Sequence, residues 1–186
     1  MFLFFLSGLL FMGCQGDNRH RIIVSVPDQK LLLLRDKMPI AIYPISTSKF
    51  GLNSQPGSYG TPLGKHKIKK KIGDGLPPGA VLKSRSFTGE ILPPNAEGRD
   101  PIVTRILWLE GLEPRNRNSY ERFIYIHGTP EERRLGEPAS YGCIRMKSSD
   151  IIQLYDIVGS GAKVQISENH LNPELLQQME MQNRNL

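Results

Sequence analysis

Cysteine is scarce in this sequence, which holds only Cys14 and Cys143 in 186 residues, together with one tryptophan and four histidines. We find no zinc-finger spacing, no aromatic RNA-binding motif and no helix-turn-helix signature, so neither a metal nor nucleic acid is an expected partner. Internal repeats and low-complexity tracts are absent too. The sequence thus favours a single globular domain whose chemistry rests on a few side chains.

Long apolar runs are also missing, apart from the first thirteen residues, MFLFFLSGLLFMG, before Cys14. This run is shorter than the roughly 20 residues that a membrane-spanning helix needs, but it has the length of a signal-peptide core. LFMGC resembles a bacterial lipobox, although Phe11 stands where leucine is usual and no Lys or Arg precedes it. We therefore expect residues 1–14 to be a signal peptide with its lipobox and Cys14 to be lipidated. A plain cleaved signal and an uncleaved anchor are the alternatives.

Cysteine usage then bears on location and on reactivity. We expect a protein exported to the bacterial cell envelope, facing the periplasm and held to the membrane through its lipidated N-terminus. If Cys14 carries lipid, Cys143 is the only thiol of the mature chain, and an unpaired thiol in an exported protein is a candidate nucleophile. A buried inert cysteine, or a disulfide between Cys14 and Cys143, are the other interpretations.

Glycine and proline are plentiful, with 18 and 14 residues, and 39% of the chain is apolar. Strand and turn signals predict a mainly β domain over 21–167, after a tether at 15–20. We expect the tail at 168–186 to be helical. The formal charge of +6 favours anionic partners such as lipid headgroups or carboxylate-rich polymers. The expected strands are 21–26, 30–36, 38–47, 65–73, 101–111, 122–129 and 162–167.

Three further segments carry local predictions. Residues 73–100 predict an insertion with little regular structure or one short hairpin. A helix is expected at 149–158, with Ser149 as its N-cap, and a second at 172–182, with Asn172 as its cap and an apolar stripe that docks on the body. We interpret Lys67, Lys69 and Lys71 as a solvated strand face.

His127 and Cys143 are the candidate catalytic pair. His127 ends the strand-like stretch RFIYIHGT, and Cys143 lies in SYGCIRM, sixteen positions later. An imidazole can take the proton of a neighbouring thiol and so produce a nucleophilic thiolate. A main-chain carbonyl would have to orient His127, because no Asp or Glu adjoins it.

The residues around Cys143 suggest supporting roles. Gly142 lets a substrate backbone approach closely, and the amides of Gly142 and Cys143 could face a developing oxyanion. Arg145 offers a planar fork for a substrate carboxylate.

HGT followed by SYGCIRM resembles the signature of the L,D-transpeptidase catalytic domain family, also called YkuD-like. In that resemblance His127 matches the general base and Cys143 the nucleophile, and Gly128 stands where a backbone carbonyl completes the triad. Ser140, Gly142 and Arg145 match the surrounding positions, and YGTPLGKHKI resembles a second family stretch. Tyr141 replaces the histidine that is usual before Gly-Cys.

The resemblance implies a β-sandwich of mixed sheets and an acyl transfer on peptidoglycan stem peptides that needs no cofactor. Cys143 would attack the L,D bond of a tetrapeptide stem, and the thioester would pass to an amine or to water. We expect a monomer, with Ser140, Tyr141, Gly142 and Arg145 at the substrate. A non-catalytic peptidoglycan-binding lipoprotein and another Cys-His cell-wall hydrolase are the alternatives.

Overall fold

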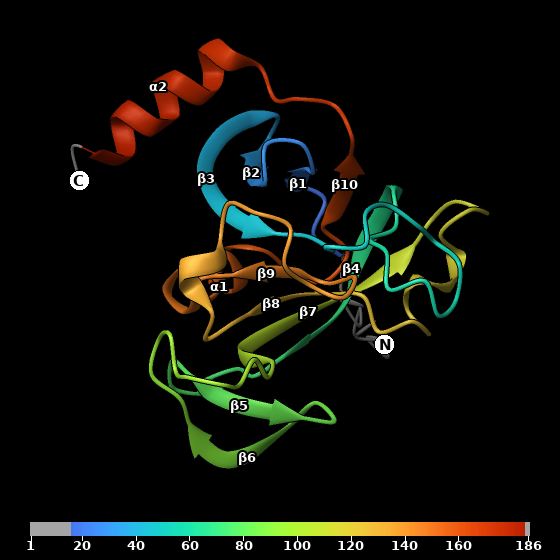
Figure 1. Cartoon of the computed structure of the whole chain (residues 1–186). Coiled ribbons are helices and arrows are strands. Elements are labelled where there is room, and N and C mark those ends of the chain that lie inside the picture. Colours follow the sequence, from blue (N-terminus) through green and yellow to red (C-terminus); the bar gives the residue numbers. More distant parts are fainter. Residues whose placement is uncertain (1–15, 185–186) are drawn as a thin grey trace, which may run out of the picture.

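The computed structural model describes residues 16–184, so the predictions for Cys14 and the apolar segment before it lie outside the described residues. The described chain is mainly β, as predicted, and is shown in Figure 1. Its strands are β1 (His20–Ser25), β2 (Lys30–Arg35), β3 (Met38–Ser46), β4 (Gly64–Ile72), β5 (Ala80–Lys83), β6 (Ser86–Ile91), β7 (Val103–Gly111), β8 (Tyr125–Gly128), β9 (Ile144–Met146) and β10 (Lys163–Ser167). Its helices are α1 (Ser148–Ile157), α2 (Pro173–Arg184) and the short 3-10 turns η1 (Arg117–Ser119) and η2 (Glu132–Arg134). None of these helices is both long and apolar enough to cross a membrane.

The strands form one mixed sheet that closes on itself. Its order is β4-β10-β1-β2-β3-β9-β8-β7-β5-β6, and β4 also pairs with β7. The pairs β1–β10 and β8–β9 are parallel, and the other pairs are antiparallel. In Figure 1, β1, β2 and β10 lie on one side of the core, and β7 and β8 lie on the other. The predicted layers of mixed sheet are thus parts of a single closed sheet with the hairpin β5–β6 attached to its β7 side.

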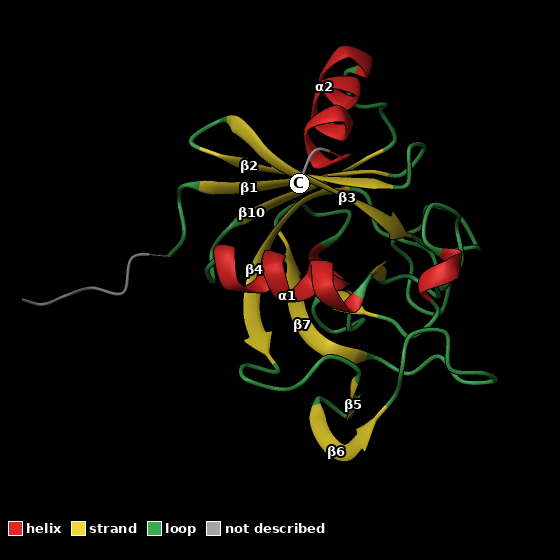
Figure 2. Cartoon of the chain, turned by 90° about the vertical axis from the view of Figure 1, so that its left-hand side faces the viewer, coloured by secondary structure: helices red, strands yellow, loops and turns green. Residues whose placement is uncertain are grey.

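The core lies inside this closed sheet. Alternate residues of the strands point inward, as the period of two in a strand requires, and they include Ile22, Leu33, Leu107, Ile126 and Ile144, all with no exposed surface. Helix α1 crosses in front of β7 in Figure 2, contacts β7 and β8, and adds its own apolar face to the same core. That face is the predicted one, made of Ile151, Leu154, Tyr155 and Val158.

Helix α1 is capped by other segments and not by its own serine. It begins at Ser148, and the prediction of Ser149 as N-cap is wrong, because the Ser148 N–H donates to Oε1 of Glu132 at 3.0 Å. At the other end, Lys71 Nζ donates to the carbonyls of Tyr155 and Val158 at 2.6 and 2.7 Å. A cation at the carboxyl end of a helix also opposes the helix dipole. The interpretation of Lys71 as a solvated side chain is therefore wrong.

The other two lysines of that strand face share one carboxylate. Glu110 accepts ion pairs from Lys67 at 2.7 Å and Lys69 at 3.0 Å, and the three side chains remain partly exposed. Such surface ion pairs contribute little to stability. The interpretation of Lys67 and Lys69 as part of a solvated strand face therefore holds.

Of two further predicted segments, one begins later than predicted and the other is confirmed. The strand expected at 122–129 begins only at Tyr125, because Phe123 has a φ of 58° in the turn that follows η1. Residues 73–100 contain one hairpin, β5–β6, which is the second of the two predicted forms.

Helix α2 confirms its predicted cap and docking. The Asn172 Oδ1 accepts the N–H groups of Glu174 and Leu175 at 2.9 and 3.2 Å. Leu171 and Met179 pack against Leu32 and Ile42 on the outside of the sheet.

A buried histidine in β4 predicts acid sensitivity. Burial lowers the pKa of His66 to about 4, and burial likewise lowers the pKa of His127 to about 4. The unfolded chain binds these protons near pH 6.5, whereas the folded chain binds them only near pH 4, so stability falls as the pH drops through that window. We expect a loss of up to roughly 3 kcal/mol per histidine in the free energy of unfolding. Urea titrations at pH 7, 5.5 and 4.5 measure it.

The matched variant for this prediction is His66→Gln, which removes one of the two titrating groups. It should reduce the loss between pH 6.5 and 4.5 by about half, since His127 remains. A pH-independent free energy of unfolding in the wild-type protein over that window would contradict the assignment of neutral buried histidines.

Candidate active site

His127 is held in one orientation at the end of β8. Its side chain is 5% exposed, and its Nδ1 lies 2.8 Å from the carbonyl oxygen of Gly128. Because a carbonyl only accepts, Nδ1 carries the proton, and Nε2 keeps a free lone pair. Burial is the main cause of its low pKa; the Gly128 carbonyl opposes this effect, and the charge of Arg145 adds to it. The resting imidazole is therefore neutral and prepared to accept a proton.

Cys143 lies just before β9, the parallel neighbour of β8. Its thiol donates to the carbonyl oxygen of Phe123 at 3.3 Å. Burial raises the thiol pKa to about 11, while a hydrogen bond from the Tyr125 N–H and the charges of Arg145 and Arg122 act in the lowering direction. The resting side chain is therefore a thiol and not a thiolate.

The pair meets at one cavity. His127 and Cys143 both line a hollow of about 160 Å³. Its other lining residues are Asp100, Ile102, Ser140, Tyr141 and Arg145. The predicted site residues are thus brought together, but Gly128 and Gly142 do not line the cavity. Gly128 contacts His127 through its carbonyl, and Gly142 lies in the loop that carries Cys143.

The loop that carries Cys143 is fixed by internal hydrogen bonds. The Ser140 hydroxyl donates to the Cys143 carbonyl at 2.6 Å and accepts the N–H of Gly142 at 3.2 Å. Gly142 has a φ of 120°, a region that favours glycine, and the Thr61 hydroxyl donates to its carbonyl at 3.1 Å. The Gly142 amide, which we expected to face an oxyanion, is therefore engaged by Ser140.

Arg145 does not present a free fork to the cavity. It is 6% exposed and pairs with the carboxylate of Asp100 and, at 3.4 Å, with that of Glu131. In this conformation two acidic residues from other loops engage the guanidinium, and the role of Arg145 toward a substrate carboxylate stays a prediction. In its observed position Arg145 acts on the site through its charge.

Tyr141 belongs to an exposed aromatic group with Phe50 and Tyr59. Their ring centroids are 5.5 to 6.0 Å apart, and each side chain is more than half exposed. Lys49 Nζ donates to the Tyr141 hydroxyl at 2.9 Å and lowers the pKa of that phenol. The tyrosine in place of the usual histidine thus forms part of a ring cluster on the rim of the cavity.

Sequence reasoning missed several residues that position the site. Arg122 donates to the carbonyls of Asn53 and Gly60 at 3.2 and 2.9 Å and so ties the 48–64 loop to the η1 turn. Thr61 was visible only as part of the stretch YGTPLG, and Asp100 and Glu131 gave no local signal. Among the described residues, no group of three or more His, Cys, Asp or Glu side chains could hold a metal ion.

A mainly β domain that sets a histidine and a cysteine at adjoining parallel strands is typical of a cysteine-dependent transpeptidase. The model of the L,D-transpeptidase catalytic domain family, YkuD, matches residues 19–166. The chain belongs to this family.

Known L,D-transpeptidases share a short stretch of this sequence, and solved ones share its fold. A curated Bacillus subtilis (strain 168) protein, YkuD, named as an L,D-transpeptidase, is 45% identical over 42 residues, which are 23% of this chain and 26% of that protein. Solved structures of an L,D-transpeptidase from Mycobacterium smegmatis and of L,D-transpeptidase 3 from Mycobacterium tuberculosis with a faropenem-derived adduct both superpose with a TM-score of 0.54. Their identities are 17% and 18%, over 80% and 81% of this chain. The chain spans 58% and 60% of those two chains, so less than two thirds of their length.

The raised pKa of Cys143 predicts slow alkylation. With a pKa of about 11, only a small fraction is thiolate at pH 7.5, so the rate with iodoacetamide should rise steadily up to pH 10 without a plateau. Peptide mapping by mass spectrometry follows Cys143 separately from Cys14, and free cysteine serves as the reference. A plateau below pH 8 would instead reveal a resting thiolate–imidazolium pair.

Proposed function

We propose that this protein is a peptidoglycan L,D-transpeptidase in which Cys143 is the nucleophile and His127 is the general base. One observation carries the proposal: the two side chains line one cavity, and Gly128 fixes the tautomer of His127 so that Nε2 is the basic atom. Membership of the family supports the reaction class.

The first half-reaction forms an acyl-enzyme. The thiol leaves its hydrogen bond to Phe123, and His127 Nε2 takes its proton as sulfur attacks the carbonyl carbon of the scissile amide. The C–N bond then breaks, and the protonated His127 gives its proton to the leaving amine. A thioester to Cys143 remains. Because burial keeps both groups neutral, proton transfer accompanies attack and does not precede it; each new charge then stabilises the other.

Two groups support the charges that develop. The N–H of Cys143 is the donor that we propose for the oxyanion, since Ser140 engages the Gly142 amide. The charge of Arg145 lowers the pKa of the thiol and the pKa of the imidazole. It therefore stabilises a thiolate at Cys143 and disfavours an imidazolium at His127. Asp100 and Glu131 temper that charge, because they pair with the guanidinium.

The second half-reaction releases the acyl group. The proposed donor is a tetrapeptide stem cleaved at the L,D bond after its third residue, commonly meso-diaminopimelate, with D-alanine as the leaving group. An acceptor amine from a second stem gives a 3-3 cross-link, and a protein lysine gives an attached protein. Water as acceptor makes the enzyme an L,D-carboxypeptidase.

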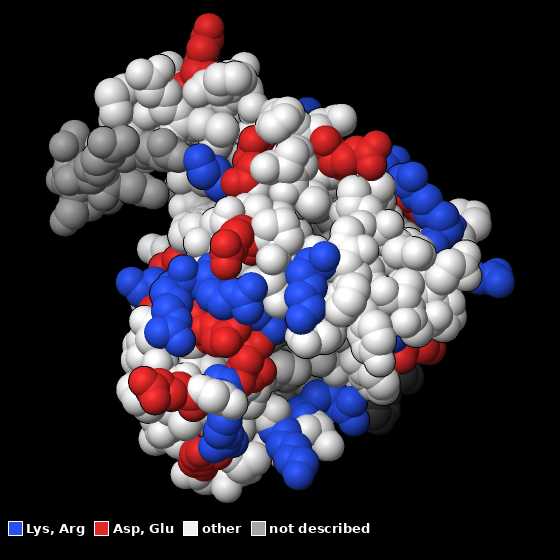
Figure 3. Space-filling view, viewed as in Figure 1, with Lys and Arg blue, Asp and Glu red and all other residues white. Residues whose placement is uncertain are grey.

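Figure 3 shows basic and acidic side chains interspersed over one face of the molecule, so that face carries no uniform electrostatic field of one sign.

The nucleophile assignment predicts a specific adduct. Imipenem should acylate the wild-type protein and raise its intact mass, whereas Cys143→Ser should remain unmodified and lose transpeptidation of purified peptidoglycan, because a serine hydroxyl is far less nucleophilic at neutral pH. Intact-mass measurement and mass spectrometry of cross-linked stems test both points. Retained cross-linking by Cys143→Ser would refute the assignment.

Two histidine variants serve as the internal comparison in that assay. His127→Ala should slow acylation by roughly 10²–10⁴-fold, the usual effect of a positioned acid–base group. His66→Ala removes an equally buried histidine that does not line the cavity, and it should leave the rate per folded molecule unchanged. The reverse result would mean that the site is elsewhere.

For location, we propose export with a lipid on Cys14, which the sequence before it supports. Two acyl chains hold a protein to a membrane stably, whereas one chain does not. Cys14→Ala should lose the label from metabolically supplied palmitate and move to the soluble envelope fraction, with the activity of each molecule unchanged. A wild-type protein that is unlabelled and soluble would leave a simple secreted enzyme.

A further inference from the structure

Positive charge is concentrated on the outer face of β1, β10 and β4, strands that do not carry the catalytic pair. In the register of the sheet, Arg21 of β1 lies directly opposite Lys163 of β10, and Lys163 lies directly opposite Lys67 of β4. Directly opposite residues project from the same face of a sheet. Arg21 and Lys163 are exposed, and Lys67 is partly exposed. Three cations therefore stand side by side across three strands.

This row is poorly neutralised by the protein itself. Lys67 pairs with Glu110 at 2.7 Å, but Arg21 and Lys163 have no ion-pair partner within residues 16–184. Like charges directly opposite one another destabilise a sheet. An external anion at this row would relieve the repulsion between the cations. The fold alone does not require three cations at these positions.

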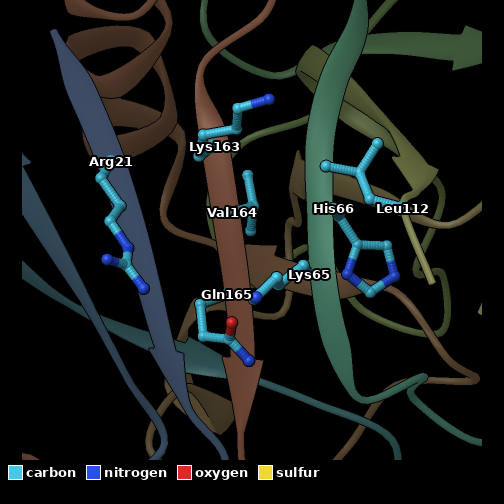
Figure 4. A pocket seen from close by; sticks show the side chains of 7 residues that line it. All are labelled: Arg21, Lys65, His66, Leu112, Lys163, Val164 and Gln165. Atoms are coloured by element: carbon cyan, nitrogen blue, oxygen red, sulfur yellow. The ribbon is translucent and has the colours of Figure 1, made fainter. Parts of the chain in front are cut away.

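Arg21 and Lys163 line two adjoining cavities. The first, of about 330 Å³, is lined by Arg21 and Lys163 together with Lys65, His66 and Gln165; Figure 4 shows Arg21 on β1 and Lys163 and Gln165 on the neighbouring β10. The second, of about 790 Å³, is again lined by Arg21 and Lys163.

Lys37 adds a further cation to the second cavity. The acidic residue of that cavity, Asp36, is already paired with Arg19 at 2.6 Å. We call Arg21, Lys37, Lys65 and Lys163 the basic face.

The first described residues lie beside the basic face. Asn18, Arg19 and His20 line the second cavity and lead directly into Arg21. Six residues separate Cys14 from Arg21, and the seven Cα–Cα steps between them span at most about 25 Å when fully extended. The segment before Cys14 is apolar over all thirteen residues apart from one serine and two glycines. Whatever surface receives that apolar segment therefore lies within reach of the basic face.

We propose that the basic face docks on the anionic phosphate headgroups of the phospholipid bilayer that receives the N-terminal segment. A basic surface and an apolar anchor are the two signals that together give stable attachment to a membrane, and each cation near an anionic bilayer strengthens binding by roughly fivefold. Docking through β1, β10 and β4 orients the domain. The strands β8 and β9, which carry His127 and adjoin Cys143, are neighbours of none of these three strands in the sheet. The inference does not depend on the proposed transpeptidase activity.

Lysine footprinting of the full chain tests the docking surface. The protein is reconstituted in vesicles of phosphatidylcholine alone or with 30 mol% phosphatidylglycerol, and trace acetylation of each lysine is followed by mass spectrometry. We expect Lys65 and Lys163 to react at least threefold more slowly on the anionic vesicles, and Lys83, which is exposed on β5, to react equally on both. The protection should disappear in 0.5 M salt, which shortens the screening length to about 4 Å. Equal rates for Lys65 and Lys163 on the two vesicles would overturn the proposal.

A matched pair of variants separates the basic face from net charge. Lys163→Glu places a carboxylate between Arg21 and Lys67, so it should raise the melting temperature by roughly 1–3 °C while the protection of Lys65 is lost. Lys83→Glu makes the same charge change on the hairpin and should keep the protection. Equal loss in both variants would overturn the proposal. Protection by soluble peptidoglycan fragments but not by phosphatidylglycerol would also overturn it and would assign the face to the cell wall.

Discussion

The parallel pairing of β8 with β9 is the constraint on which the rest of the site depends. It sets His127 opposite Arg145 and brings Cys143, two residues before Arg145, to the cavity that His127 lines. A parallel pair cannot be joined by a tight turn, so the chain between the two strands must cross over. That crossover supplies Glu131, Ser140 and the Cys143 loop itself. One pairing thus determines the positions of His127, of Cys143 and of the groups that hold both.

The site combines electrically neutral reactants with strongly fixed surroundings. Burial keeps the proton on the sulfur and off the imidazole, and hydrogen bonds from Ser140 and Thr61 fix the loop without using the thiol. The free-energy cost of ordering the site residues is therefore met when the protein folds, and the reaction itself does not have to order them. The closed sheet supports that ordering, because β4 pairs with β10 on one side and β7 on the other and is not an open edge.

The sequence predicted well those features that depend on local pattern. Alternation located most strands, Asn172 and Pro173 located the start of α2, and the pair of HGT and SYGCIRM identified the family. Features that depend on distant segments were missed. Lys71 caps α1 from another strand, Glu132 replaces Ser149 at its start, and Asp100 and Glu131 occupy the fork of Arg145. None of these contacts has a local signature, because each joins residues that only the closed sheet brings together.

The hydrogen bond from the Cys143 thiol to the carbonyl of Phe123 has a consequence for the lifetime of the protein. Oxidation to sulfenic acid and beyond proceeds from the thiolate, and its rate follows the thiolate fraction and exposure of the sulfur. A half-buried thiol that keeps its proton is therefore a poor target for peroxide and for mixed disulfides. Under the proposed export, no glutathione would reverse such damage, and the same contact would preserve the proposed nucleophile until a substrate arrives.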